Sequence, residues 1–187
     1  KDPNKLLEAA KTEKPEVVGQ SFYYWNTFLN QAVAKQLRAM LGTGTTIVWG
    51  GPSVDTNFAE REGLFRRFPE VDAFVSNEGE LGFANIIAKR LEDFSNLWKA
   101  PIDGIVFTDG SDLVVGEEVG LSLDLDELPS PYMSGLLDSF LSGEFLPLLQ
   151  TSRLCPYTCT FCVSGKNEGK LRAFPLEQVK AEIDYLT

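Results

Sequence analysis

The residues best suited to chemistry in this chain are its three cysteines, Cys155, Cys159 and Cys162, which have the spacing CxxxCxxC. Three thiolates on one short loop can bind three irons of a [4Fe–4S] cluster and leave the fourth iron open. A cluster that only transfers electrons normally has four protein thiolates. The spacing therefore predicts a cluster whose open iron can bind a substrate or cofactor.

Other uses of these cysteines fit the sequence less well. A structural zinc site has four Cys or His ligands, and the chain has no histidine and no fourth cysteine, so zinc would need a carboxylate or a ligand from elsewhere. A redox dithiol formed by Cys159 and Cys162 would leave Cys155 unexplained. A chain of 187 residues with three cysteines also has no need of a disulfide scaffold.

The surroundings of the cysteines resemble the radical S-adenosylmethionine (SAM) superfamily. That superfamily has the same spacing with an aromatic residue before the last cysteine, which here is Phe161. Residues 153–157, RLCPY, resemble an RGCPY variant in which Leu154 replaces glycine. Glycine would ease a tight turn at that point, so Leu154 bears on the geometry of the loop and not on its ligands.

The segments on either side of the cysteines fit the same superfamily. Residues 148–152 are predicted to form a short strand that leads into the loop. After Arg172, an apolar face at helical spacing predicts a helix, and Pro175 suits its first turn. That face consists of Leu176, Val179, Ile183 and Leu186. Strand, cluster loop and helix would be the first unit of the partial TIM-type barrel of the superfamily.

The resemblance implies a chemistry for each of these residues. Cys155, Cys159 and Cys162 would bind the cluster, its unique iron would chelate SAM, and Phe161 would lie against the adenine. Reductive cleavage of SAM would then give methionine and a 5′-deoxyadenosyl radical, which abstracts hydrogen from an unreactive carbon. The implied partners are an electron donor such as a flavodoxin or ferredoxin, and a small-molecule or peptide substrate.

The first two thirds of the chain alternate between strand and helix signals. This alternation predicts a Rossmann-like or flavodoxin-like parallel sheet covered by helices. Strands are expected at 17–21, 46–49 and 71–75, helices at 28–41, 58–68 and 83–91, and a terminal hairpin from 105–107 and 113–115.

Three loops follow the carboxyl ends of these strands, where open α/β sheets bind ligands. Their candidate binding residues are Ser21, Trp25, Gly50, Gly51, Glu78, Gly79 and Glu80. Paired glycines let a ligand approach the backbone closely. The glycines could equally be only turn residues, and the two glutamates could only favour the dipole of a helix that starts there.

The order of the motifs is more informative than any single loop. VVGxS, GGP, VDxxVxxEGE, LPSPY and CxxxCxxC follow one another, and this order resembles the radical SAM enzymes that have a cobalamin-binding domain. The resemblance implies such a domain at 1–122, a linker with an interdomain helix at 123–145, and the start of the radical SAM domain at 146–187. The candidate loop residues named above would contact cobalamin, which in this class often relays a methyl group.

The absence of histidine constrains how the chain could hold cobalamin. Many cobalamin domains ligate cobalt with a histidine, whose neutral imidazole is a good ligand for such metals. This chain has none, and the loop at 20–26 offers aromatic residues instead. The sequence predicts that bound cobalamin has its own base displaced and its lower face packed against this loop.

Composition limits the partners and the location. The net charge is −10 and no basic patch is visible, whereas nucleic-acid binders usually carry one, so no nucleic-acid partner is expected. No apolar stretch approaches the ~18 residues of a membrane span, and no signal peptide is visible. A cytoplasmic location is expected, where thiols stay reduced.

The chain is expected to be a fragment of a longer enzyme and to be inactive by itself. A first strand of the cobalamin domain should precede residues 1–11, and a full TIM barrel takes about 250 residues. Three functions are considered. They are a cobalamin-dependent radical SAM enzyme, a radical SAM oxidoreductase whose N-terminal domain binds substrate or a partner instead of cobalamin, and a flavodoxin-like binding module with a metal-binding appendix.

Overall fold

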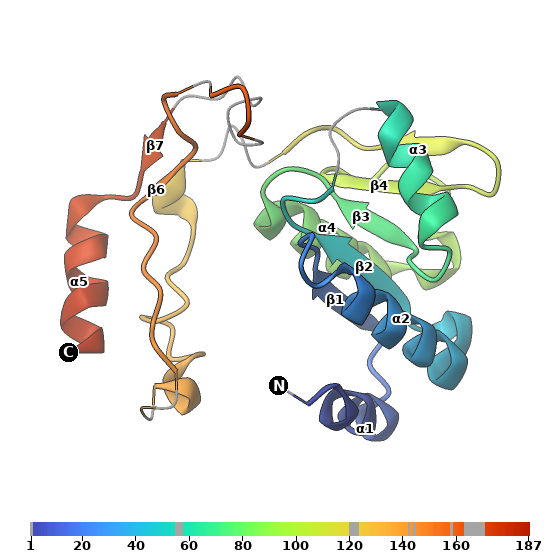
Figure 1. Ribbon diagram of the computed structural model, residues 1–187, viewed down its shortest axis with the longest axis horizontal. Coiled ribbons are helices and arrows are strands. Elements are labelled where there is room, and N and C mark those ends of the chain that lie inside the picture. The colour runs from blue at the N-terminus through green and yellow to red at the C-terminus, as the bar shows by residue number, and fades with distance from the viewer. Residues whose placement is uncertain are drawn as a thin grey trace. The chain divides into compact units, whose positions relative to one another are not determined.

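The computed structural model describes residues 2–54, 58–119, 124–141, 143, 145–157, 159–162 and 171–187. The chain divides into two compact units, Lys1–Leu121 and Ser122–Thr187 (Figure 1). Each unit is described by itself. None of the helices in the described part of the chain has the length and apolar composition needed to cross a bilayer.

The first unit contains a sheet of five strands in the order β1-β2-β3-β4-β5. The strands are β1 (Val17–Ser21), β2 (Thr46–Gly50), β3 (Ala73–Val75), β4 (Ile105–Thr108) and β5 (Leu113–Val115). The first three strands are parallel, as the alternation predicts. β4 and β5 form the expected hairpin.

The predicted parallel sheet ends at β3, because β4, the first strand of the hairpin, runs antiparallel to β3. The segment between α4 and β4 carries the buried side chains of Leu97 and Ile102 back along the sheet, so β4 starts at the carboxyl end of β3. Gly104 is pinned there against the start of α4, because a Cβ on Gly104 would lie 2.7 Å from the Cα of Gly82. This close approach fixes the chain beside the start of α4, one residue before β4 begins.

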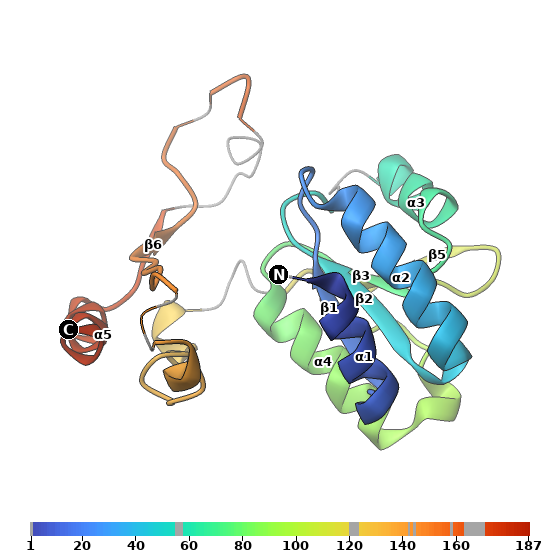
Figure 2. The same ribbon diagram turned by 60° about the horizontal axis from the view of Figure 1, so that its bottom comes forward.

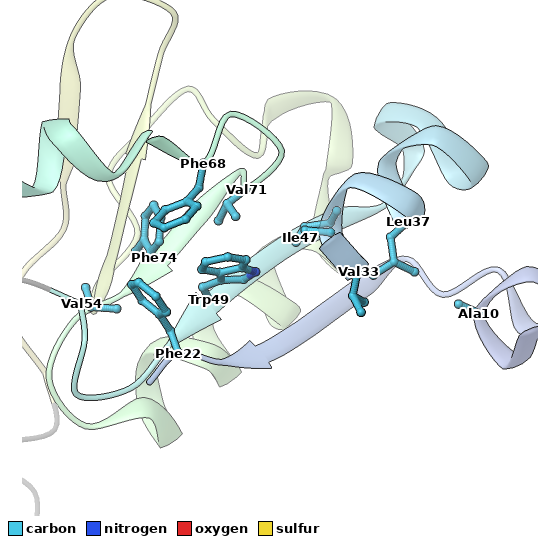
Figure 3. Packing of buried hydrophobic residues seen from close by; sticks show 11 residues of the cluster. Ala10, Phe22, Val33, Leu37, Ile47, Trp49, Val54, Phe68, Val71 and Phe74 are labelled. Atoms are coloured by element: carbon cyan, nitrogen blue, oxygen red, sulfur yellow. The ribbon is translucent and has the colours of Figure 1, made fainter. Parts of the chain in front are cut away.

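Helices cover both faces of the sheet (Figures 1 and 2). They are α1 (Pro3–Glu13), α2 (Thr27–Leu41), α3 (Phe58–Arg67) and α4 (Gly79–Glu92). β2 lies in the middle of two cores, because Ile47 and Trp49 are buried with side chains from α2 and Val48 is buried with Ile86 of α4. Figure 3 shows the first of these cores around Trp49.

The second unit has less regular structure in its described residues. Its elements are η3 (Leu125–Glu127), η4 (Asp138–Phe140), β6 (Ser152–Arg153), β7 (Arg172–Ala173) and α5 (Leu176–Leu186). α5 confirms the helix predicted after Arg172. β6 is shorter than the strand expected at 148–152, and it pairs antiparallel with β7. Among the described residues the unit is a β-ribbon and a helix, and the barrel stays a prediction.

The helix expected within 123–145 is absent from the residues that the structure describes there. The helical elements of this described part are the 3-10 turns Leu125–Glu127 and Asp138–Phe140. Gly135 and Gly143 have φ values of 73° and 98°, in the left-handed region that ends a right-handed helix. The apolar spacing of Leu136, Leu137, Phe140 and Leu141 therefore does not produce a continuous helix.

Candidate functional site

The sheet brings the predicted loop residues of the first unit together at one edge. Ser21 is paired with Gly50, and Gly50 is paired with Val75, so β1, β2 and β3 end side by side. Gly51 follows directly after β2, and Gly79 is the first residue of α4. The carboxyl edge of the parallel strands therefore carries Ser21, Gly50 and Gly79 around one site.

A cavity of about 400 Å³ lies at this edge. It is on the α4 face of the sheet, because Val48 and Val75 belong to that core and Phe83 comes from α4. The lining residues are Gly19, Gln20, Ser21, Val48, Gly50, Val75, Gly79 and Phe83. The lining is mostly apolar, so the cavity suits an apolar or aromatic group rather than a charged one.

Sequence reasoning missed the apolar half of this lining. Gly19 could have been found, because residues two apart on a strand share a face and Gly19 precedes Ser21 by two. Phe83 and Val75 carry no signal of their own in the sequence. They join the cavity only because α4 packs on this face of the sheet.

The glycines at this edge have different roles. Some are required by the packing of the protein itself, and one borders space that a cofactor could occupy. A Cβ on Gly19 would lie 2.7 Å from Cζ of Phe83, and a Cβ on Gly50 would lie 3.1 Å from Cβ of Val75. These two glycines are needed for packing. A Cβ on Gly79 would meet nothing within 4 Å, so Gly79 borders open space that a ligand can occupy.

Gly51 is required by the backbone. Its φ is 130°, and a Cβ there would lie 2.9 Å from the carbonyl oxygen of Phe22. The interpretation of Gly51 as a turn residue is therefore correct, and it does not exclude contact with a ligand. The turn also holds the loop after β2 against the loop after β1, because the N–H of Ser53 donates to the carbonyl of Phe22 at 3.2 Å.

The two predicted glutamates lie at the start of α4 and do not line the cavity. Glu78 is the N-cap residue and its side chain makes no capping hydrogen bond, while Glu80 lies in the first turn and is exposed. Their position fits the alternative interpretation, in which carboxylates at a helix start interact favourably with its dipole.

The loop after β1 presents aromatic rings at the same edge. In this aromatic loop, residues 22–26, Phe22 is buried in the core, whereas Tyr24 and Trp25 are 81% and 66% exposed. The rings of Tyr23 and Trp25 are stacked with centroids 4.4 Å apart, and Tyr24 meets Trp25 edge-on. Tyr24 and Trp25 therefore form an exposed aromatic surface at this edge.

In the second unit the three cysteines lie on the loop after β6. Cys155 and Cys159 are exposed and Cys162 is half-buried. The N–H of Cys162 donates to the carbonyl of Cys159 at 3.0 Å, which makes a tight turn between them. Leu154 has φ 66°, so the backbone adopts the left-handed conformation that glycine favours at this position of the motif.

The donor set fits an iron–sulfur cluster, because its first ligands are thiolates. In the described part of the chain, no three Cys, His, Asp or Glu side chains are grouped closely enough to hold a metal ion. Phe161, between Cys159 and Cys162, is 90% exposed. The assignment of Cys155, Cys159, Cys162 and Phe161 to the cluster and to SAM stays a prediction.

Comparison with known proteins supports the resemblance seen in the motifs. No protein-family model matches the chain. Over 185 residues it is 33% identical to a 2-(S-pantetheinyl)-carbapenam-3-carboxylate methyltransferase of Streptantibioticus cattleyicolor, covering 95% of this chain and 26% of that protein. Over 180 residues it is 32% identical to the cobalamin-dependent radical SAM methyltransferase TokK of Streptomyces tokunonensis, covering 92% and 25%.

A third relative has a different name. Over 122 residues the chain is 31% identical to an anaerobic magnesium-protoporphyrin IX monomethyl ester cyclase of Synechocystis, covering 62% of the chain and 22% of that protein. The chain spans about a quarter of the length of these relatives. Over nearly its whole length it is homologous to cobalamin-dependent radical SAM methyltransferases, which confirms the resemblance predicted from its motifs.

Proposed function

We propose that this chain is part of a radical SAM enzyme that binds cobalamin at the edge of its sheet and transfers a methyl group to a small-molecule or peptide substrate. The observation that carries the proposal is the apolar cavity between Ser21, Gly50 and Gly79, in a chain homologous to a cobalamin-dependent radical SAM methyltransferase. Cys155, Cys159 and Cys162 would supply the thiolate ligands of the iron–sulfur cluster that cleaves SAM.

The residues of the sheet edge suit the two parts of cobalamin, a flat corrin ring and a nucleotide tail that ends in an aromatic base. The cavity is apolar and open beside Gly79, which suits the base. The exposed rings of Tyr24 and Trp25 suit one face of the corrin. Because the chain has no histidine, it offers no imidazole to cobalt, so the aromatic loop would pack against the lower face.

The cysteine loop would hold the cluster and SAM. Its thiols at Cys155 and Cys159 are exposed and therefore accessible to iron, and the exposed ring of Phe161 is available to stack on adenine. When bound, the cluster supplies the electron that cleaves SAM, and cobalamin supplies the methyl group. The protein's own contribution is to position these groups and keep water away from them. A flavodoxin or ferredoxin would deliver the electron.

A second candidate is a radical SAM oxidoreductase whose sheet domain binds a substrate or a partner instead of cobalamin. The relative named as an ester cyclase favours this candidate, because its name does not describe a methyl transfer. The same apolar cavity would then take part of the substrate. A third candidate, a flavodoxin-like module with a metal-binding appendix, has no support beyond the exposed thiols.

Two measurements on the longer enzyme that we propose contains this chain separate the three candidates. Anaerobic reconstitution followed by iron and sulfide assays should give four irons per protein, and a protein that binds no iron would reject both radical SAM candidates. Hydroxocobalamin added to the same protein should bind and change its visible spectrum. Iron without cobalamin binding would favour the second candidate.

Electron paramagnetic resonance of the bound Co(II) form tests how cobalamin is held. Since the chain has no histidine and the base is proposed to be displaced, the spectrum should show no superhyperfine splitting from a nitrogen below cobalt. Splitting from such a nitrogen would mean that the base or another imidazole remains on the metal, and would contradict the placement of the aromatic loop at the lower face.

A further inference from the structure

The side chain of Asn26 does not do what its position predicts. Asn26 directly precedes α2, where an asparagine side chain usually caps the first free N–H groups of the helix. It makes no capping hydrogen bond. Its Oδ1 instead accepts from the N–H of Tyr23 at 2.9 Å, and its Nδ2 donates to the carbonyl of Ser21 at 2.8 Å. Asn26 therefore holds the loop before it and not the helix after it.

Two more side chains from the first turn of α2 hold the same loop. Nδ2 of Asn30 donates to the carbonyl of Ser21 at 2.6 Å. The hydroxyl of Thr27 lies 3.0 Å from the carbonyl of Tyr23 and 3.2 Å from that of Tyr24. Thr27 and Asn30 are only 7% and 8% exposed. We call Asn26, Thr27 and Asn30 the polar clamp.

The polar clamp connects the two parts of the candidate site. The carbonyl of Ser21, a residue that lines the cavity, accepts from two amides, which occupies both of its lone pairs. The clamp's other bonds go to the backbone of Tyr23 and Tyr24 in the aromatic loop. The edge of the cavity and the exposed aromatic rings are thus held by one set of side chains.

The loop has an apolar anchor in addition to these hydrogen bonds. Phe22 already anchors the loop in the core, where it is 4% exposed and packs against Trp49. Exposed loops are normally mobile, and a binding surface that is fixed before the ligand arrives loses less entropy when it binds. The hydrogen bonds to Tyr23 and Tyr24 fix the backbone that carries the exposed rings of Tyr24 and Trp25.

We propose that the polar clamp is a positioning device: it holds the aromatic loop and the cavity at the spacing that lets one ligand occupy both. This proposal rests on the proposed function, in which the ligand is a corrinoid with its ring on the aromatic loop and its tail base in the cavity. Asn26, Thr27 and Asn30 act through Ser21 and the tyrosines and need not touch the ligand.

Two corrinoids test the coupling. Cobalamin has the nucleotide tail, and cobinamide has the same ring without it, so the ratio of their dissociation constants measures how well both parts bind at once. Asn26→Asp replaces the amide donor that faces the Ser21 carbonyl, and Thr27→Val removes the hydroxyl at nearly constant volume. Each should reduce the preference for cobalamin by about tenfold, the effect of one or two hydrogen bonds.

The chain offers a matched control for each variant. Asn85→Asp makes the same change in an amide that donates to the carbonyl of Asp103 at 3.1 Å. Thr12→Val makes the same change in a hydroxyl that donates to the carbonyl of Glu8 at 3.1 Å. Both controls should leave the ratio unchanged. Clamp variants that weaken both corrinoids equally, with an unchanged ratio, would overturn the proposal.

A second measurement needs no ligand and separates this proposal from the function on which it rests. Trp25 is 66% exposed, whereas Trp49 is fully buried and Trp98 is half-buried, so iodide quenches the fluorescence of Trp25 more strongly than that of the other two. Near-ultraviolet circular dichroism reports the stacking of Tyr23 on Trp25. If the unaltered chain binds neither corrinoid, the proposed function fails. The clamp is then rejected if Asn26→Asp and Thr27→Val leave quenching and dichroism unchanged, and it is upheld if both change at an unaltered unfolding midpoint.

Discussion

The two units of the chain differ in how completely they bury their apolar side chains. In the first unit, Trp49, Phe74 and Phe107 are fully buried between the sheet and its helices. In the described part of the second unit, Leu125 and Tyr132 are the buried hydrophobic residues, whereas Leu146 and Leu148 are 96% and 85% exposed. The first unit packs Phe22 of its aromatic loop into its own core, whereas Cys155 and Cys159, as far as the structure describes the second unit, are exposed.

This difference in burial explains why the sheet edge has a formed cavity and the thiols of Cys155 and Cys159 are exposed. The sheet edge already has the cavity and the ordered aromatic loop that a cofactor needs. The cysteine loop has the thiols that the cluster prediction requires, but Cys155, Cys159 and Phe161 are exposed. The packing around a loop fixes the positions of its binding groups, whereas the residue types fix which ligands it can bind. A loop can therefore have suitable residues without holding them in the binding geometry.

The largest expected effect is the loss of one cofactor from the second unit while the first unit still binds the other. In the longer enzyme, Cys159→Ala should abolish the reconstituted cluster, because a thiolate ligand is lost and the chain has no spare cysteine. Cobalamin binding at the sheet edge should not change. Iron and sulfide assays and visible spectra measure both, and Thr160→Ala, one residue further on, is the control. Full iron content in Cys159→Ala would reject the radical SAM assignment.

The next effect tests the unequal cores directly. Trp49→Ala should destabilise the first unit by about 3–5 kcal/mol, because it empties the centre of the core shown in Figure 3. It also removes the hydrogen bond that Nε1 of Trp49 donates to Gln20 at 2.7 Å. Leu148→Ala should change the free energy of unfolding by less than about 0.5 kcal/mol, because its side chain is exposed.

Urea unfolding followed by circular dichroism measures both variants. A large loss of stability in Leu148→Ala would mean that the second unit has a core that depends on this side chain. The comparison between the units would then fail.

A smaller effect distinguishes the glycines of the sheet edge. Gly51→Ala should cost about 1–3 kcal/mol of stability, because φ is 130° there and the new Cβ would press on the Phe22 carbonyl. Gly79→Ala has open space around its Cβ and should leave stability nearly unchanged while weakening cobalamin binding. Thermal unfolding and a spectral titration measure the two properties. Unchanged binding in Gly79→Ala would place the ligand away from α4.

The smallest effect concerns a contact within the second unit. The hydroxyl of Tyr185 in α5 donates to Oδ1 of Asp138 at 2.6 Å, and this hydrogen bond raises the pKa of Tyr185 above its ordinary value. Since the folded pKa is the higher one, the stabilisation is complete below about pH 10 and is lost as the pH rises through the raised pKa. Because both groups are exposed, solvent screening keeps the effect small.

Phenolate absorbance during a pH titration checks this contact. Asp138→Asn should move the ionisation of one tyrosine to lower pH and leave the unfolding of the first unit unchanged. Identical titration curves for the two proteins would show that α5 and η4 are not linked in solution.

The sequence by itself determined the elements of the first unit and the residues whose types suit ligand or metal binding. The periodicities of β1, α2, β2 and α4 and the hairpin of β4 and β5 are local patterns, so they could be predicted without the fold. The same holds for Ser21, Gly50 and Gly79, because strand ends in a parallel sheet share an edge. Residue type and spacing alone indicated the ligands of the cysteine loop.

Only the tertiary structure decided the features that depend on contacts between distant residues. β4 pairs antiparallel with β3, and Gly104 packs against Gly82 just before it. The left-handed backbone at Gly135 and Gly143 interrupts the helix expected in the linker. Phe83 completes the cavity because α4 packs on one face of the sheet. Asn26 directly precedes α2 but bonds to Ser21 and Tyr23 instead of capping the helix, because the fold brings the Ser21 carbonyl and the Tyr23 N–H within reach of its amide.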